Sequence, residues 1–350
     1  MSDLSLMPVS GMKTTGDDTR LIVTHANKSQ DVFMRDIVDM DVEQGGGVSL
    51  RPGLRQVSDK PFANLWQSPL HGDVFATLGD DWVRVSTNWE GEVLAQVGDA
   101  ECWHTVLNNK VVVSGAEGLF EFDGTQARRL TIEAGVPPGV STAAQAGALV
   151  EGDYGVALAF MRGDVEGPLS EMATVKVKQD DALEVVLPLV FDATVTKVRV
   201  YVTKPDGGEL GLIGDYAPAS SVVFPTIPVP GISPRFPRMQ PMVSGKYLCV
   251  WQGRLLTANR NVLYFSEPLA YHINDPRHGF IQMPQRITFL APVEGGIWVG
   301  QVDHVVFLQG MQPDQLVTQR RAVQAPVPGS AILIPSEVAG EAAQGGRHVV

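Results

Sequence analysis

The segment HINDPRH comes closest to a reactive cluster in this sequence. His272 and His278 flank Asp275, a combination of side chains able to hold a metal ion or exchange protons. The spacing matches no ligand motif, and Pro276 inside the segment favours a loop that follows a strand. We therefore interpret Asn274, Asp275 and Pro276 as a turn whose polar groups hydrogen-bond the loop backbone.

Three further carboxylates, Asp39, Asp41 and Glu43, share one face of an expected strand. They are spread along that strand, and no glycine-pinned loop with a bidentate glutamate follows them, as a calcium site requires. A solvated strand face therefore explains them better than a metal site. The pairs Asp17-Asp18 and Asp80-Asp81 are interpreted in the same way, as carboxylates of a tail and a turn.

Motifs for nucleophilic, nucleotide or metal chemistry are missing from the sequence, including G-x-S-x-G, the P-loop, G-x-G-x-x-G and H-E-x-x-H. A glycosidase needs two carboxylates that face each other across a cleft. With 39 acidic residues, spacing alone cannot identify such a pair. We therefore predict no catalytic, cofactor-binding or metal-binding residues, no cofactor and no enzyme activity.

Aromatic and thiol side chains have plainer explanations. Residues 66–131 contain Trp66, Trp82, Trp89 and Trp103, four of the six tryptophans. Such residues usually pack between sheets, and a sugar-stacking platform is the alternative. Whether Trp298 lies in a core or at a contact stays open. Cys102 and Cys249 are 147 residues apart and show no zinc spacing. We expect them to be buried free thiols.

The composition favours a soluble protein with many short strands. The chain has 350 residues, is 44% hydrophobic and 19% charged, and contains 36 glycines and 24 prolines, which suit tight turns better than long helices. A net charge of −12 argues against a nucleic-acid binder, and the densest basic pairs are only Arg128-Arg129 and Arg320-Arg321. No signal peptide and no membrane-spanning run is found.

The elements that position these residues are repeated hairpins. Residues 255–266 resemble residues 111–122, which lie 144 positions earlier, and residues 297–308, which lie 42 positions later. Each copy has two apolar runs around a short polar connection, the pattern of a β-hairpin. A weaker copy at 73–85 places Phe75 45 residues before Phe120. Spacings of 42 and 45 suit a four-stranded propeller blade.

The interval of 144 residues is one repeat plus roughly a hundred residues, which predicts a domain inserted between two repeats. We expect a body at 1–135 and 232–350, and an insertion at 136–231. The insertion resembles a fibronectin type III module in the strand with a central Tyr154, the EGPLSE link and the VRVYVT and VVF strands. We expect an extended arm at 1–19, a stiff proline-rich tether at 227–241 and, at 345–350, the opening strand of a further repeat.

The most distinctive text runs from YFSEPL through RITFLAPVEGGIWVG to VFLQG, within residues 264–310. Together with SLRPG at 49–53, it resembles the tail accessory proteins (hub, nozzle or stabilisation proteins) of tailed, mainly short-tailed, bacteriophages. These residues are 52 of the 350 in the chain, and repeat order extends the likeness further. Members of this family are often longer than this chain.

This resemblance implies an all-β, propeller-like or barrel body with an immunoglobulin- or fibronectin-like insertion. It implies a structural virion protein that is assembled in the host cytoplasm and forms a tail ring, usually of six copies. The ring would adjoin the portal-adaptor ring, prolong the DNA channel, serve genome ejection and anchor fibre, spike or needle proteins. DNA would pass without specific binding, and no membrane span is expected. The alternative function is a carbohydrate-binding propeller or an enzyme that degrades host polysaccharide, whose sign would be aromatic residues and paired carboxylates in one pocket.

Overall fold

The computed structural model describes residues 8–13, 17–43, 46–51, 53–228, 231–322, 324–335 and 347–349. The chain divides into two compact units, Met1–Asp59 and Lys60–Val350. The prediction of an all-β chain is confirmed, because the described residues contain strands and two short 3-10 helices but no α-helix. Within this described part, no helix has the length and apolar character needed to cross a membrane.

The unit Met1–Asp59 has strands but almost no core. Its elements are β1 (Gly11–Met12), η1 (Asp18–Arg20), β2 (Ile22–Thr24), β3 (Gln30–Met34), β4 (Met40–Val42) and β5 (Val48–Leu50). β3 pairs with parallel β1 and antiparallel β2, while β4 and β5 form a hairpin. Val9 is the one buried hydrophobic side chain among its described residues. Eight large hydrophobic side chains are exposed: Met12, Ile22, Val38, Met40, Val42, Leu50, Leu54 and Val57.

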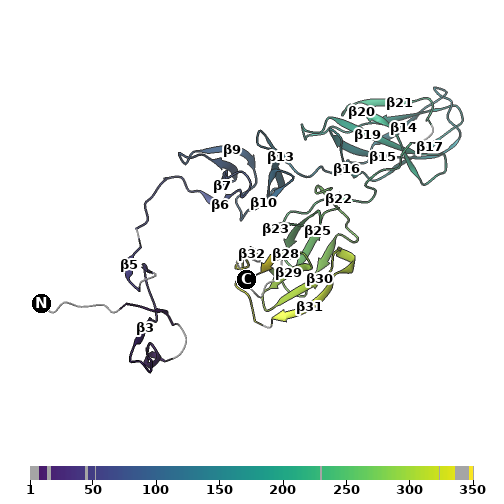
Figure 1. The fold of residues 1–350 in the computed structure, drawn as a ribbon. Helices are drawn as coiled ribbons and strands as arrows, with labels where there is room; N and C mark the ends of the chain where they lie inside the picture. Colours follow the sequence, from purple (N-terminus) through teal and green to yellow (C-terminus); the bar gives the residue numbers. More distant parts are fainter. Residues whose placement is uncertain are drawn as a thin grey trace. The chain divides into compact units, whose positions relative to one another are not determined.

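The unit Lys60–Val350 contains four antiparallel sheets of four strands each, in which every strand pairs with the strand before it in the same sheet (Figure 1). Sheet 1 comprises β6 (Ala63–Gln67), β7 (Val74–Leu78), β8 (Asp81–Val85) and β9 (Gly91–Gln96), and sheet 2 comprises β10 (Trp103–Leu107), β11 (Lys110–Gly115), β12 (Gly118–Phe122) and β13 (Ala127–Arg129). Sheet 3 comprises β23 (Lys246–Trp251), β24 (Arg254–Asn259), β25 (Val262–Phe265) and β27 (Phe280–Gln282), and sheet 4 comprises β28 (Ile287–Val293), β29 (Gly296–Gln301), β30 (Val305–Gln309) and β31 (Val317–Ala322).

The predicted hairpins at 111–122, 255–266 and 297–308 are confirmed as the second and third strands of sheets 2, 3 and 4. Leu119 pairs with Ser114, and 144 positions later Leu263 pairs with Ala258. The hairpin at 73–85 is likewise the middle of sheet 1. The turns therefore occupy equivalent positions in all four sheets.

The predicted equivalence of Phe75 and Phe120, from which a repeat spacing of 45 residues followed, is wrong. Phe75 lies in the second strand of sheet 1, whereas Phe120 lies in the third strand of sheet 2. Pairing across the turns makes Trp82 the counterpart of Leu119, so the spacing is 37 residues. The two phenylalanines are the same residue type in similar apolar runs, but they lie in different strands of their sheets.

Alternate side chains of sheet 2 pack against different neighbours, because successive residues of a strand point to opposite faces. Val111 and Val113 lie in an apolar cluster with Phe75 of sheet 1. Val112, between them, lies in a second cluster with Leu255 of sheet 3. Sheet 2 is therefore buried on both faces.

Sheets 3 and 4 share a further apolar cluster, in which Leu256 and Leu263 pack with Ile297 and Val306. The first strands of sheets 2, 3 and 4 also lie beside one another in that order. The four sheets therefore pack one against the next in sequence order, and sheets 2, 3 and 4 are also joined along their first strands.

Residues between sheets 2 and 3 form two more sheets. One comprises β14 (Gly139–Ala143), β18 (Ala182–Val186) and β21 (Ser221–Phe224); the other comprises β15 (Gly152–Arg162), β16 (Val165–Leu169), β17 (Ala173–Val177), β19 (Lys197–Thr203) and β20 (Leu210–Tyr216). Their facing side chains form one core, in which Leu158 and Val200 pack with Leu183 and Phe224. We call this region the two-sheet segment. Tyr154 is the third of the eleven residues of β15, not its centre.

Short elements complete the described chain. β22 (Gln240–Pro241) pairs with β26 (Ile273–Asn274), β32 (Leu333–Pro335) pairs with β33 (Arg347–Val349), and η2 spans Pro313–Gln315. The proline-rich stretch at 227–241, expected as a tether, contacts β20: the Gly231 N–H donates to the Leu212 carbonyl, and the Leu212 N–H donates to the Ile232 carbonyl.

Candidate functional site

An open pocket with aromatic and charged side chains lies on sheet 1, and we call it the Trp89 pocket. It encloses about 670 Å³ and is lined by β8, by the β8–β9 loop and by residues beside β7. Trp89 is its one aromatic lining residue, and its charged lining residues are Asp73, Arg84, Glu90 and Glu92. This mixture of an indole with acidic and basic groups suits a polar, hydroxyl-bearing ligand.

A tight loop presents Trp89 at this pocket. The Ser86 N–H donates to the Glu90 carbonyl at 2.8 Å, and the Trp89 N–H donates to the Ser86 carbonyl at 3.0 Å. This closure holds Trp89 at a φ of 59°, in the left-handed region that glycine or asparagine normally occupies in such hairpin loops. A bulky residue there costs about 1–2 kcal/mol. The indole packs beside Phe62, with the ring centroids 6.4 Å apart.

The charged groups of the pocket are ordered by ion pairs. Arg84 donates from Nε (2.9 Å) and Nη2 (2.6 Å) to the same Glu92 oxygen, Oε2. The guanidinium also lies 5.5 Å from the centre of the Phe122 ring, a cation–π distance. Glu90 pairs with Lys60. Two of the three lining carboxylates are thus neutralised, so the pocket is better suited to binding than to acid–base catalysis.

A second concave region, of about 640 Å³, lies where the first strands of sheets 2, 3 and 4 meet. Trp103 and Tyr247 pack together in its wall, with ring centroids 4.5 Å apart. Burial raises the pKa of Tyr247 above its ordinary value. The one carboxylate in the lining, Glu101, is paired with Lys246 at 2.5 Å. This region therefore does not offer the two facing carboxylates of a glycosidase.

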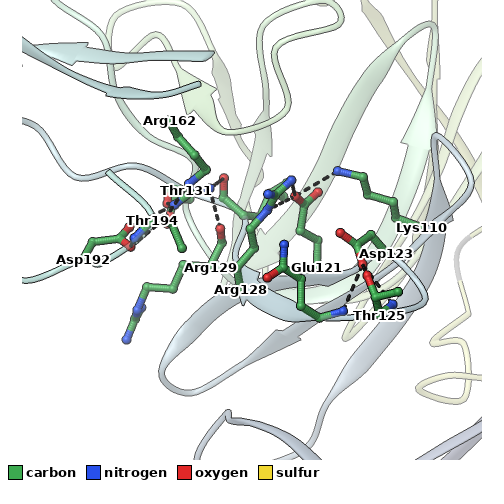
Figure 2. A network of polar contacts seen from close by, with 12 residues as sticks. Lys110, Glu121, Asp123, Thr125, Arg128, Arg129, Thr131, Arg162, Asp192 and Thr194 are labelled. Atoms are coloured by element: carbon green, nitrogen blue, oxygen red, sulfur yellow. Dashed lines mark hydrogen bonds and ion pairs between the residues drawn. The ribbon is translucent and has the colours of Figure 1, made fainter. Parts of the chain in front are cut away.

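Figure 2 shows a polar network that joins the two-sheet segment to sheet 2. On the sheet 2 side, the half-buried ammonium of Lys110 (3.0 Å) and guanidinium of Arg128 (2.7 Å) both donate to Glu121 Oε1. Glu121 is buried, and its two cationic partners offset the cost of removing its charge from water.

Arg162, at the end of β15, is the centre of the other side of the network (Figure 2). Its guanidinium donates to the carbonyl of Arg129, the last residue of β13, at 2.7 Å and to the carbonyl of Thr131, just after β13, at 3.1 Å. It also donates to Asp192 Oδ2 at 3.0 Å and to Thr194 Oγ1 at 2.8 Å. Burial alone would raise the pKa of Asp192, but hydrogen bonds from Thr194 and Arg162 lower it overall.

His272 makes a second link to the two-sheet segment. Its Nε2–H donates to the Glu166 carbonyl at 2.8 Å, so the neutral ring carries its proton on that nitrogen. Burial lowers the pKa of His272 below its ordinary value. The Glu166 carboxylate accepts from the Tyr201 hydroxyl at 2.7 Å and pairs with Arg199 at 3.2 Å. The two histidines of HINDPRH have different surroundings, because His272 is buried and His278 is exposed.

The predicted hydrogen bonding of polar groups in HINDPRH to the backbone is confirmed, but the turn comes later than predicted, because Asn274 ends β26 and the turn residues are 276–278. Asn274 Nδ2 donates to the Phe265 and Gly279 carbonyls, both at 2.7 Å. Asp275 accepts from the Arg277 N–H at 2.9 Å and pairs with its guanidinium. These groups stabilise the loop backbone, as the sequence indicated.

The other acidic residues singled out from the sequence are separate from one another. Asp41 pairs with Arg51 at 2.6 Å, while Asp39 lies outside β4 with a φ of 55°. Asp18 pairs with Arg35 at 2.5 Å. In the described ranges, no three His, Cys, Asp or Glu residues are grouped as a metal site would require.

The tryptophans differ in their surroundings. Trp82 is fully buried, and its indole N–H donates to His104 Nε2 at 3.1 Å. Trp66 stacks on the same imidazole, with centroids 5.2 Å apart and planes 8° from parallel. Packing between sheets is thus confirmed for these two, whereas Trp89 lines a pocket. Trp298 packs against Phe307, with ring centroids 4.8 Å apart, on the face of sheet 4 opposite the core shared with sheet 3.

Both cysteines are free thiols; Cys102 is buried and Cys249 is half-buried. Burial raises the pKa of Cys102 to about 11 and that of Cys249 to about 12. Of the basic pairs, Arg129 donates to the Glu117 carbonyl at 2.6 Å beside Arg128, and Arg321 donates to Gln319 in β31 beside Arg320.

Sequence reasoning missed Asp73, Arg84 and Glu92 as pocket residues. No sequence signal identified them, because the left-handed position of Trp89 is visible only from its backbone conformation and the loop hydrogen bonds.

Comparison with known proteins identifies no family. No family model matches the chain, and no curated protein matches it. Among solved structures, Sqt1 of Saccharomyces cerevisiae is similar over 89% of this chain and 74% of its own, with 11% identity and a TM-score of 0.34. The AfRom2 CNH domain is similar over 82% of this chain and 93% of its own, with 9% identity and a TM-score of 0.19.

Proposed function

We propose that this chain is a structural protein of a bacteriophage tail that assembles as a ring, with a propeller-like body and a fibronectin type III-like insertion. The proposal rests on the resemblance of residues 264–310 to tail accessory proteins. It is supported by four meander sheets that pack in sequence order, three of them joined along their first strands, an arrangement compatible with propeller blades.

The observation that carries the assembly role is the exposed N-terminal unit. Among its described residues, eight large hydrophobic side chains are exposed and one is buried. Ordering a residue costs about 1–2 kcal/mol of backbone entropy, which so small a buried area cannot offset. Contact with another copy would cover these side chains, and a head-to-tail contact that repeats around an axis closes a ring.

The ring would prolong the DNA channel below the portal-adaptor ring and anchor neighbouring tail proteins. A net charge of −12 supports passage of DNA without binding, because contacts from lysine and arginine would add affinity by counterion release. A basic channel in the assembled ring would contradict this part of the proposal.

The experiment is the mass of the full chain in solution, by sedimentation, with negative-stain images of the same sample, alone and with adaptor rings. We expect rings of about six copies. Leu54→Asp should reduce assembly, whereas Lys28→Ala, at an exposed polar position of the same unit, should not. A monomer under both conditions would refute the ring.

The alternative, a glycan-degrading enzyme, needs two carboxylates that face each other across a cleft. The Trp89 pocket favours a saccharide-binding role over catalysis, since Glu90 and Glu92 are held in ion pairs. Incubation with host polysaccharide, followed by measurement of chain length, tests the enzyme directly.

A further inference from the structure

We propose that the Trp89 pocket is a binding site for a neutral saccharide. This inference goes beyond the proposed structural role and does not depend on ring formation. It would give the tail protein a contact with a glycan surface.

The first support is the position of the tryptophan. The fold of the β8–β9 loop requires a left-handed residue at position 89, where φ is 59°. Glycine satisfies that requirement without strain, and tryptophan does not. Its indole does cover part of sheet 1, beside Phe62 and the buried Val83. Yet an aliphatic cover placed elsewhere would give the same burial without the strain, so the ring is better explained by contact with a ligand.

The second support is the chemistry beside the ring. A pyranose presents an apolar face of C–H groups and a rim of hydroxyl groups. The face would stack on the indole, and the hydroxyls would bond to charged groups that can donate or accept two hydrogen bonds each. Both nitrogens of Arg84 that bond Glu92 converge on Oε2, which leaves Glu92 Oε1 able to accept from a ligand.

Asp73 supplies a further acceptor in the pocket lining. Its carboxylate has no hydrogen-bond or ion-pair partner among the residues that the structure describes, since only its backbone carbonyl is bonded, by Ser68. The lining carries three carboxylates and one guanidinium, a net negative charge that disfavours acidic sugars and phosphates. A neutral saccharide is therefore the favoured class.

The volume agrees with this class. A cavity of about 670 Å³ falls within the range of small-molecule sites, about 300–1,000 Å³, and has room for more than one sugar ring. The ion pairs of Arg84 and Glu90 also fix the rim before a ligand arrives, which lowers the entropy cost of binding.

The test uses the full chain with its indole N–H signals recorded by NMR, and Trp89→Phe to assign the Trp89 signal. The probes are glucose, galactose, mannose, N-acetylglucosamine and their disaccharides at millimolar concentration, with glucuronic acid as the charged comparison. We expect saturable shifts of the Trp89 signal with at least one neutral probe and weaker shifts with glucuronic acid.

Variants separate binding from folding. The Trp89→Gly chain should melt at the same temperature as the Trp89→Ala chain or at a higher one, because glycine relieves the left-handed strain. Both variants should abolish binding. Asp73→Asn should weaken binding about tenfold, the usual effect of one charged hydrogen bond. Trp298→Phe, at a half-buried tryptophan outside the pocket, should bind as the unmodified chain does. No shift with any neutral probe, or stronger shifts with glucuronic acid, would overturn the proposal.

Discussion

Protonation of His104 should destabilise the junction of sheets 1 and 2. The imidazole lies against Trp66 and accepts a hydrogen bond from the Trp82 indole, a role that only the neutral ring can fill. Burial lowers its pKa from 6.5 to about 4.

The magnitude follows from linkage. A pKa lowered from 6.5 to about 4 corresponds to about 3 kcal/mol of folding free energy. Because the folded pKa is the lower one, this stability is fully present above pH 6.5 and is lost as the pH falls from 6.5 to 4. Below pH 4 this residue contributes no further loss.

The assay is urea unfolding, monitored by tryptophan fluorescence, at pH 7 and pH 4, for the unmodified chain and His104→Gln. Glutamine can accept the Trp82 bond without titrating, so the variant should lose about 3 kcal/mol less between the two pH values. The difference between the chains removes the effect of other groups, such as His272, whose pKa is also lowered by burial. Equal losses in the two chains, or an NMR titration of His104 near pH 6.5, would refute the reasoning.

Three further predictions concern packing and reactivity. Gly296→Ala should destabilise sheet 4 by about 3 kcal/mol or more, because the new Cβ would lie 2.0 Å from the Leu308 carbonyl oxygen, whereas Gly295→Ala meets no atom within 4 Å and should be neutral in thermal melts. Arg162→Met should lower the free energy of unfolding by about 3 kcal/mol, because it leaves Asp192 and backbone carbonyls without their donor. Urea unfolding measures this loss, with Arg260→Met at an exposed site as the control. An unchanged urea midpoint for Arg162→Met would contradict the assigned role. Cys102 and Cys249 should react slowly with a thiol reagent at pH 8 in the folded chain and rapidly in denaturant, because their pKa values are raised to about 11 and 12; fast labelling of the folded chain would show that they are accessible thiolates.

The repeated hairpins were predictable because a turn of fixed length sets the pairing register of the two strands that it joins. The residues that determine this register are close together in the sequence. The correspondence of Leu119 with Leu263 shows this. The equivalence of Phe75 with Phe120 failed because apolar residues occur in every strand and residue type alone does not distinguish the second strand from the third.

Two residues adopt a left-handed backbone conformation that the sequence did not predict, and each changes the local structure from the one expected. The strand expected to carry Asp39, Asp41 and Glu43 is shorter than those positions require, because Asp39 has a φ of 55° and β4 spans only Met40–Val42. Trp89 has a similar backbone conformation. Only the loop hydrogen bonds reveal these conformations, since neither residue type announces them.

The network around Arg162 could not be predicted at all. Its partners lie about thirty positions away on both sides, in the chain leaving sheet 2 and in the loop before β19. No local pattern marks an arginine that bonds carbonyls across such a distance, because the contact depends on how two separately folded regions meet.

The almost coreless unit Met1–Asp59 has a consequence for assembly kinetics. If each copy orders this unit only on a neighbour, the first contact between two copies must overcome the backbone entropy lost on ordering. Later contacts share this cost. Ring formation would then show a sharp threshold in protein concentration, with few incomplete rings below closure. Closure gives the last copy a neighbour on both sides, so the completed ring would be the only oligomer in which every such unit is covered.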